Sequence, residues 1–236
     1  MKYLLLSILL LPVFLLNSCD VDDPPDDPDD NDTINTTAIV NGSFELWTME
    51  SQNNVEFETP GGGYWASLNN LVFLGGPLVA TKTTNSHTGS YALHLEAKAW
   101  GDDWVIPGII AAGIFDSNQT IGENLVMGRA ITVEPTSISM YYRYLPADND
   151  TAVIYSSLTK YNQNLQRRDT IAEAYLTIVD VANEYTHLVL PFEYRSALHD
   201  HDTINIIFLT SISGDKMKAH EGSILEVDDI ELIVTE

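Results

Sequence analysis

The sequence is short of cysteine, of basic residues and of long apolar runs. Cys19 is the only cysteine among 236 residues, so no disulfide can form within the chain, and stability must come from a hydrophobic core. Roughly 200 residues are enough to bury one. Lysines and arginines number 11 against 34 aspartates and glutamates, and the formal net charge is −23 at pH 7. Because phosphate backbones bind basic surfaces, this balance argues against nucleic acid as a partner.

The main apolar run lies near the N-terminus, between residues 4 and 16, after the single charge of Lys2. It is shorter than the roughly 20 residues that a helix needs to cross a bilayer, and it has the length of a signal-peptide core. The following Leu16-Asn17-Ser18-Cys19 resembles the lipobox of bacterial lipoproteins, although Asn17 departs from its usual pattern. We therefore predict a lipoprotein signal peptide at 1–18 and lipidated Cys19 as the only anchor. The alternative is a generic secretory signal with an incidental cysteine.

Residues 19–37 follow, and of these 20–32 are almost only aspartate and proline. Such a segment buries nothing and repels itself, so it stays extended and can hold a domain away from a membrane. Acidic residues directly after a lipidated cysteine resemble the surface-export signal of Bacteroidota lipoproteins. We predict a tether that displays the protein on the outer membrane at the cell surface. The alternative is a plain spacer on the periplasmic side.

From residue 38 to residue 236 the sequence predicts strands. Between 137 and 145, apolar Ile138 and Met140 alternate with outward positions, and period two with β-branched and aromatic residues is typical of strands. No segment of ten or more residues has a convincing helical period. The predicted fold is an all-β, two-sheet antiparallel β-sandwich of jelly-roll type, with strands at 90–99, 137–145, 152–161, 172–181, 185–194, 203–212 and 223–234. The less regular regions 48–76 and 100–127 predict long loops, which tend to carry function.

Several short motifs occur in order along this region: Asn41-Gly42-Ser43-Phe44-Glu45-Leu46-Trp47, Ser86-His87-Thr88-Gly89-Ser90-Tyr91 and Val227-Asp228-Asp229-Ile230-Glu231-Leu232. Together they resemble the putative carbohydrate metabolism domain (PCMD) family of Bacteroidota surface lipoproteins. The first and last motifs also resemble jelly-roll carbohydrate-binding modules. The resemblance covers roughly 39–234, and it implies a carbohydrate role without naming a reaction.

The resemblance also implies a metal site. In jelly-roll modules, acidic residues equivalent to Glu45, Asp228 and Asp229 hold a structural calcium with carbonyls of a turn like 88–90, and calcium takes six to eight oxygen ligands. Alternation along the last strand sends Asp228 and Asp229 to opposite faces. We predict that Asp229 faces inward, although Ile230 and Leu232 argue for the opposite phase. The alternative is that these acids cap turns and bind nothing.

Two tryptophans flank two carboxylates in the segment Trp100-Gly101-Asp102-Asp103-Trp104. Aromatic faces and polar edges suit a pyranose ring and its hydroxyls, so these four side chains are predicted to contact carbohydrate, with Tyr161 as a secondary candidate. The alternative is that both tryptophans fold inward, because tryptophan is usually mostly buried. Trp47 and Trp65 are predicted to pack in the core.

Evidence for catalysis is weaker. A glycosidase usually needs two carboxylates about 5–10 Å apart, and Asp102 and Asp103 are the best candidates for such a pair. The sequence has no Gly-x-Ser-x-Gly motif and no phosphate-binding loop. His199 and His201 could form a metal pair, but no further ligands accompany them. Asp-Thr-aliphatic triplets resemble the O-glycosylation motif of Bacteroidota proteins and predict modification at Thr33, Thr151, Thr170 and Thr203.

These observations favour a surface-tethered lipoprotein that binds a polysaccharide or oligosaccharide without cleaving it, within a polysaccharide-utilisation system. A glycoside hydrolase or related carbohydrate-active enzyme is the first alternative, and a structural or adhesive protein without a sugar ligand is the second. The predicted partners are a glycan, the membrane through the lipid anchor alone, and outer-membrane glycan-uptake proteins. The only predicted cofactor is structural calcium.

Overall fold

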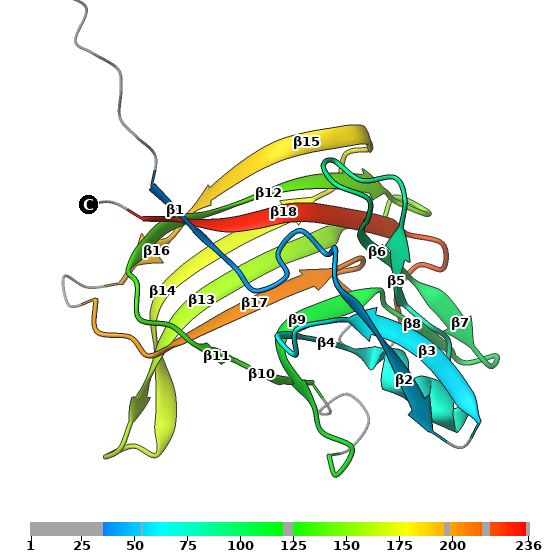
Figure 1. The fold of residues 1–236 in the computed structure, drawn as a ribbon, viewed down its shortest axis with the longest axis horizontal. Helices are drawn as coiled ribbons and strands as arrows, with labels where there is room; N and C mark the ends of the chain where they lie inside the picture. Colours follow the sequence, from blue (N-terminus) through cyan, green and yellow to red (C-terminus); the bar gives the residue numbers. More distant parts are fainter. Residues whose placement is uncertain (1–34, 53, 120–124, 196–198, 214–217, 235–236) are drawn as a thin grey trace, which may run out of the picture. The chain divides into compact units, whose positions relative to one another are not determined.

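A computed structural model describes residues 35–52, 54–119, 125–195, 199–213 and 218–234 (Figure 1). The predicted signal peptide, Cys19 and most of the predicted tether lie outside the described residues. Within the described ranges, no helix is long and apolar enough to cross a membrane.

The first sheet has six strands. Its spatial order is β15-β12-β18-β6-β5, with β1 also paired to β18, and all of these pairings are antiparallel. Figure 1 shows β15, β12 and β18 side by side, so the last strand of the chain lies inside the sheet. The strands are β1 (Asn35–Ala38), β5 (Ala80–Thr83), β6 (Ala92–Glu96), β12 (Pro135–Leu145), β15 (Ala182–Pro191) and β18 (Ile224–Val234).

The second sheet has eight strands in the order β10-β9-β17-β13-β14-β16, and β4 and β11 add to β9 and β17. The long hairpin β13–β14 and its neighbour β17 form its centre. The strands are β4 (Trp65–Ser67), β9 (Ile109–Phe115), β10 (Leu125–Met127), β11 (Arg129–Ala130), β13 (Ala152–Asn162), β14 (Arg167–Ile178), β16 (Glu193–Tyr194) and β17 (Thr203–Leu209).

One hydrophobic core fills the space between the two sheets. Leu93, Ile138 and Met140 of the first sheet are fully buried, as are Ile154 and Phe208 of the second. Each belongs to a period-two series, so alternate positions of the same strands face outward. The predicted all-β fold with two main antiparallel sheets is confirmed, and so is the alternation predicted for 137–145.

The prediction of long irregular loops at 48–76 and 100–127 was wrong in part, because both regions contain short elements. The first holds a hairpin and a 3₁₀-helix, and the second holds another hairpin followed by β9. Several of the strands in these regions have only three residues, which is too short to display a period. The elements are β2 (Trp47–Gln52), β3 (Val55–Pro60), η1 (Leu68–Leu74), β7 (Lys98–Trp100) and β8 (Trp104–Ile106).

Both tryptophans of the opening motifs pack as predicted. Trp65 is buried, and its ring lies 5.4 Å from that of Phe44 and 6.1 Å from that of Phe208. Trp47 is partly buried against the same core, and its indole N–H donates to the carbonyl of Phe44 at 2.6 Å. The opening motif therefore anchors the start of the domain to the sandwich.

Candidate functional site

Three carboxylates hold the turn 86–91, which connects β5 to β6. The carboxylate of Glu45 accepts the backbone N–H groups of Ser90 and Tyr91 at 2.8 and 3.0 Å. Gly89 has φ +64°, and a Cβ there would lie 2.1 Å from the Oε1 of Glu45. Glycine is therefore required, because any side chain would push the carboxylate away from the turn.

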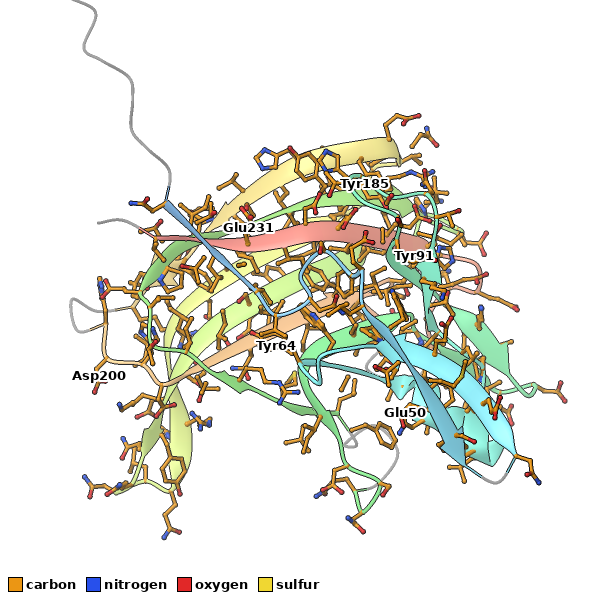
Figure 2. The ribbon with its side chains drawn as sticks, viewed as in Figure 1. Glu50, Tyr64, Tyr91, Tyr185, Asp200 and Glu231 are labelled. Carbon is orange, nitrogen blue, oxygen red and sulfur yellow. The ribbon has the colours of Figure 1, made fainter. Side chains whose placement is uncertain are left out.

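The same turn is held from β18. Asp228 Oδ2 accepts the backbone N–H groups of His87 and Thr88 at 2.8 and 3.2 Å. Asp229 accepts the hydroxyl of Thr88 at 2.8 Å and lies 2.7 Å from the Nδ1 of His87. The edge strand β15, which carries Tyr185 (Figure 2), adds a further tie. The hydroxyl of Tyr185 donates to the carbonyl of Asn85, the residue before the turn, at 2.7 Å. The first and last motifs thus meet at this turn, as the resemblance implies.

The prediction that Asp229 faces inward was wrong. Asp228 is fully buried, whereas the side chain of Asp229 keeps 22% of its exposure. The reason is a β-bulge: the register with β12 shifts between Ser139 and Tyr141, and Asp229 takes φ +49°. The extra residue reverses the alternation, so Val227 is buried before the bulge and Ile230 after it.

Burial is the main cause that raises the pKa of Asp228, and the charge of Asp229 is the second. Together they bring it to about 6, although three backbone N–H groups stabilise the carboxylate. The contacts of Glu45 and Asp228 are those of turn-capping groups, with N–H donors on the Oε1 of Glu45 and on both oxygens of Asp228. Among the described residues, no group of three or more His, Cys, Asp or Glu side chains is arranged to hold a metal ion. Structural calcium stays a prediction.

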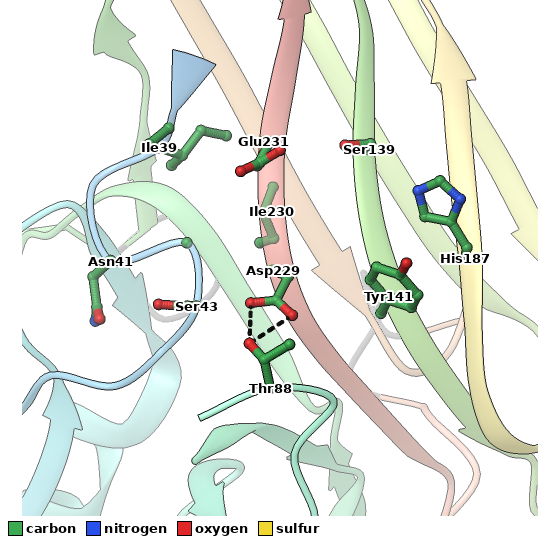
Figure 3. A pocket seen from close by; sticks show the side chains of 12 residues that line it. Ile39, Asn41, Ser43, Thr88, Ser139, Tyr141, His187, Asp229, Ile230 and Glu231 are labelled. Atoms are coloured by element: carbon green, nitrogen blue, oxygen red, sulfur yellow. Dashed lines mark hydrogen bonds between the residues drawn. The ribbon is translucent and has the colours of Figure 1, made fainter. Parts of the chain in front are cut away.

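A pocket of about 450 Å³ opens beside this turn on the outer face of the six-stranded sheet, and we call it the acidic pocket. Figure 3 shows Asp229 and Glu231 along β18 in the middle of it, with Tyr141 of β12 and His187 of β15 on one side. Asn41 and Ser43 lie on the other side. The ring of Tyr141 lies between two imidazoles, 3.4 Å from that of His87 and 4.8 Å from that of His187. Carboxylates therefore face a wall of stacked rings.

The outer face of the eight-stranded sheet has a different composition. Tyr155 of β13 and Tyr175 of β14 are directly opposite each other in register, with ring centroids 6.4 Å apart. The hydroxyl of Tyr155 donates to Glu173 at 3.0 Å, and Glu173 also forms an ion pair with Arg195. This hydrogen-bonded ion pair holds the pKa of Glu173 below its usual value. We call these four residues the tyrosine face.

A row of polar residues continues the tyrosine face across the sheet. Ser157 is opposite Glu173 on one side and Asn205 of β17 on the other, and the amide of Asn205 donates to the hydroxyl of Ser157 at 3.0 Å. A pocket of about 420 Å³ lies against Tyr155, Tyr175 and Glu173. Pockets of this size that combine apolar walls with a few convergent polar groups are typical ligand sites.

The predicted tryptophan site forms a separate hairpin, β7–β8. Trp100 and Trp104 meet edge to face at 5.4 Å, and Trp100 packs on a small cluster that includes Leu71 and Ile106. Trp104 is 42% exposed, and both Asp102 and Asp103 are exposed in the turn. One ring is thus covered and the other is open to solvent. Sugar contact and an acid pair at this hairpin stay predictions.

Tyr161, the secondary candidate, lies near the tip of the β13–β14 hairpin. It is 47% exposed and lines a pocket of about 460 Å³ with Lys160 and Asp169. Its distance along β13 from Tyr155 separates it from the tyrosine face, and sugar contact there stays a prediction. Tyr155 and Tyr175 were not among the residues predicted from the sequence, although their alternation with buried Ile154 and Ala174 is a signal that both face outward.

The histidine pair at the start of β17 has other partners. Nδ1 of His201 lies 2.6 Å from the carbonyl of His199, and its Nε2 lies 2.9 Å from the carbonyl of Val133. Both ring nitrogens of His201 therefore face backbone oxygens, while His199 pairs with Glu134. Of the predicted glycosylation positions, Thr203 is buried, Thr151 and Thr170 are half-buried, and Thr33 lies outside the described residues.

Comparison with known proteins decides the family. The sequence matches the family described as "Putative carbohydrate metabolism domain" over residues 41–233. The protein belongs to this family. The predicted resemblance is thereby confirmed over nearly the whole described region, and the domain is related to carbohydrate metabolism. A search of curated proteins found no match.

Solved structures similar to this family member are β-sandwiches of carbohydrate-related proteins. A putative glycoside hydrolase from Bacteroides vulgatus ATCC 8482 has 21% identity and a TM-score of 0.68, over 82% of this chain and 97% of that one. Another from Bacteroides thetaiotaomicron VPI-5482 has 20% identity and a TM-score of 0.67, over 86% and 71%. A carbohydrate-binding module specific for non-crystalline cellulose has a TM-score of 0.42 at 14% identity, over 84% and 94%. At these identities, the first two structures support the fold alone.

Proposed function

We propose that the protein is a lipid-anchored surface protein that binds a neutral polysaccharide or oligosaccharide at the tyrosine face without cleaving it. The observation that carries the proposal is the pair of opposed tyrosines beside an ion pair. Tyr175 is 55% exposed, so its ring is open to solvent in a large part. Rings of this kind supply rigid contact area, and Glu173 and Arg195 supply an acceptor and donors for sugar hydroxyls.

Charge supports a neutral glycan. The full sequence carries a formal net charge of −23, and a strongly negative protein repels polyanions. Arg195 is the cation of the tyrosine face, and Glu173 already neutralises it. Uronate-rich or sulfated chains therefore find no unpaired positive charge on this face.

The protonation state of Glu173 argues against the role of general acid at this face. A glycosidase needs a carboxylic acid that keeps its proton near neutral pH, which requires a raised pKa. Arg195 lowers the pKa of Glu173 instead, so this group is an ionised acceptor. A carboxylate of this kind can orient a sugar hydroxyl but cannot protonate a leaving group.

A glycan screen on the mature protein tests this function. We expect binding to neutral glycans with no release of reducing ends on prolonged incubation. Release of reducing sugar that is lost on mutation of a carboxylate would identify a glycoside hydrolase instead. No response to any glycan, with capture of a protein partner, would identify a structural or adhesive protein.

Tethering is the second part of the proposal. The lipobox-like sequence ending at Cys19 and the acidic segment after it support an outer-membrane anchor with the domain at the cell surface, near glycan-uptake proteins. Metabolic labelling with a fatty acid should mark the wild type and not Cys19→Ala. Degradation by protease added to intact cells should distinguish surface display from the periplasmic side, where the protein would be protected.

A further inference from the structure

The acidic pocket lies on the sheet face opposite the tyrosine face and has no role in the function proposed above. Its floor is β18, where the bulge at Asp229 restores an alternation that places Asp229 and Glu231 on the same outer side. Two residues along a strand advance about 6.7 Å. The bulge thus presents two carboxylates on the same side of the strand, where one ligand can contact both (Figure 3).

The two carboxylates differ in their partners. Asp229 accepts the hydroxyl of Thr88 and faces His87, so the turn already engages it. Glu231 is half-buried, and among the described residues no side chain forms a hydrogen bond or ion pair with it. A partly desolvated carboxylate without a partner is unfavourable, and a cationic or hydroxyl-bearing ligand would relieve that cost.

No lysine or arginine lines the pocket, and the buried Asp228 is the chain neighbour of Asp229. The local potential therefore favours cations and disfavours anions. On the opposite wall, His187 is exposed and its ring stacks on Tyr141. The hydroxyls of Ser43 and Ser139 also line the pocket. Polar walls of this kind suit a hydroxylated ring better than the aliphatic stem of a lysine side chain, which packs along apolar surface.

We propose that the acidic pocket binds a hexosamine unit with a free amine, whose ammonium group contacts Glu231 and Asp229 while its ring lies against His187. Such a group forms charge-assisted hydrogen bonds with carboxylates. N-acetylation removes the charge, and a uronate reverses it. The pocket thus selects the amino sugar over both of its common relatives. This site is separate from the neutral-glycan site at the tyrosine face.

Titration calorimetry on the mature chain at pH 6.5 and low salt tests the proposal. The probes are a glucosamine tetrasaccharide, its fully N-acetylated form and a galacturonic acid oligomer. We expect the glucosamine tetrasaccharide to bind at least tenfold more tightly than the other two. We also expect Glu231→Gln to weaken that binding at least tenfold, without lowering the melting temperature. Equal affinity for the free and acetylated amine would overturn the proposal.

Two control variants separate the pocket from general charge and from the tyrosine face. Glu184→Gln removes an equal charge from an exposed position of β15, and it should leave the affinity for glucosamine within twofold. A loss as large as that of Glu231→Gln would mean a diffuse electrostatic effect and would overturn the site. Tyr175→Ala should not change glucosamine binding. The acidic pocket can therefore be tested even if the tyrosine face binds no glycan. A lysine tripeptide with an acetylated N-terminus keeps its side-chain amines. If it bound more tightly than the sugar, the proposal that the ligand is an amino sugar would be overturned.

Discussion

The two outer faces of the sandwich share one core but differ in how deeply their carboxylates are buried and in which groups pair with them. On the eight-stranded sheet, Glu173 is paired with Arg195, and both remain partly open to solvent. On the six-stranded sheet, Glu226 and Asp228 are buried, and they bond to side chains and backbone N–H groups of neighbouring segments. The outward positions of a sandwich are free of the core, so each face can acquire its own chemistry. Here one face offers tyrosines beside a neutralised ion pair, and the other offers negative charge beside stacked rings.

Removing one acid from each face should give the largest contrast. Glu226 pairs with Arg143 and His94, and its side chain is 7% exposed, so Glu226→Ala leaves a largely buried guanidinium unpaired. We expect a loss of about 3 kcal/mol in the free energy of unfolding. The pair of Glu173 and Arg195 is 33% and 57% exposed, so Glu173→Ala should cost less than about 1 kcal/mol. Urea unfolding measures both, and equal losses would contradict the contrast between the faces.

Lowering the pH should change the stability contributions of two carboxylates of β18, Glu226 and Asp228, in opposite directions. Asp228 has its pKa raised to about 6, above an unfolded value near 3.9, so the folded state takes up its proton first. This group therefore stabilises the fold as the pH falls from 7 to 4. Burial would raise the pKa of Glu226 as well, but His94, Asn85 and Arg143 lower it overall, so its contribution is lost at low pH.

The measurement is thermal unfolding of the wild type and Asp228→Asn between pH 7 and pH 4. Over this interval the wild type should gain about 2 kcal/mol relative to the variant, because asparagine cannot titrate. Parallel stability curves for the two proteins would show that Asp228 titrates as it does in the unfolded chain.

The sequence is a good guide to the core and a poor one to the faces. Period two along β12 predicts Ile138 and Met140 as core residues, because burial of one face repeats along the whole strand. The same rule fails at Asp229, since a single extra residue reverses the phase. Ile230 and Leu232 already conflict with the phase of Leu225 and Val227, but that conflict does not locate the extra residue. Tyr155 and Tyr175 come together only through the register of a hairpin, which their separation along the chain does not reveal.

Binding at the tyrosine face should depend on one exposed ring. Tyr175→Ala is expected to weaken the affinity for a neutral glycan about tenfold, or about 1.4 kcal/mol, because it removes the more exposed of the two stacking surfaces. Tyr161→Ala is the matched control, since Tyr161 is similarly exposed but belongs to the hairpin tip. Calorimetry with the best glycan of the screen compares the two. A larger loss for Tyr161→Ala would move the site to the hairpin tip.

Calcium should have the smallest effect, because the three carboxylates of the turn already have partners. An ion that binds Asp228 or the Oε1 of Glu45 must compete with N–H donors, so its affinity is limited by the contacts that it replaces. An ion at ten times its Kd would still stabilise the fold by about 1.4 kcal/mol. Melting in excess calcium, in magnesium and after exhaustive chelation measures this, with Glu45→Gln as the variant that should lose the response. An unchanged melting temperature after chelation would leave the carboxylates as caps of the turn, and the acidic side of the sandwich would then depend on hydrogen bonds alone.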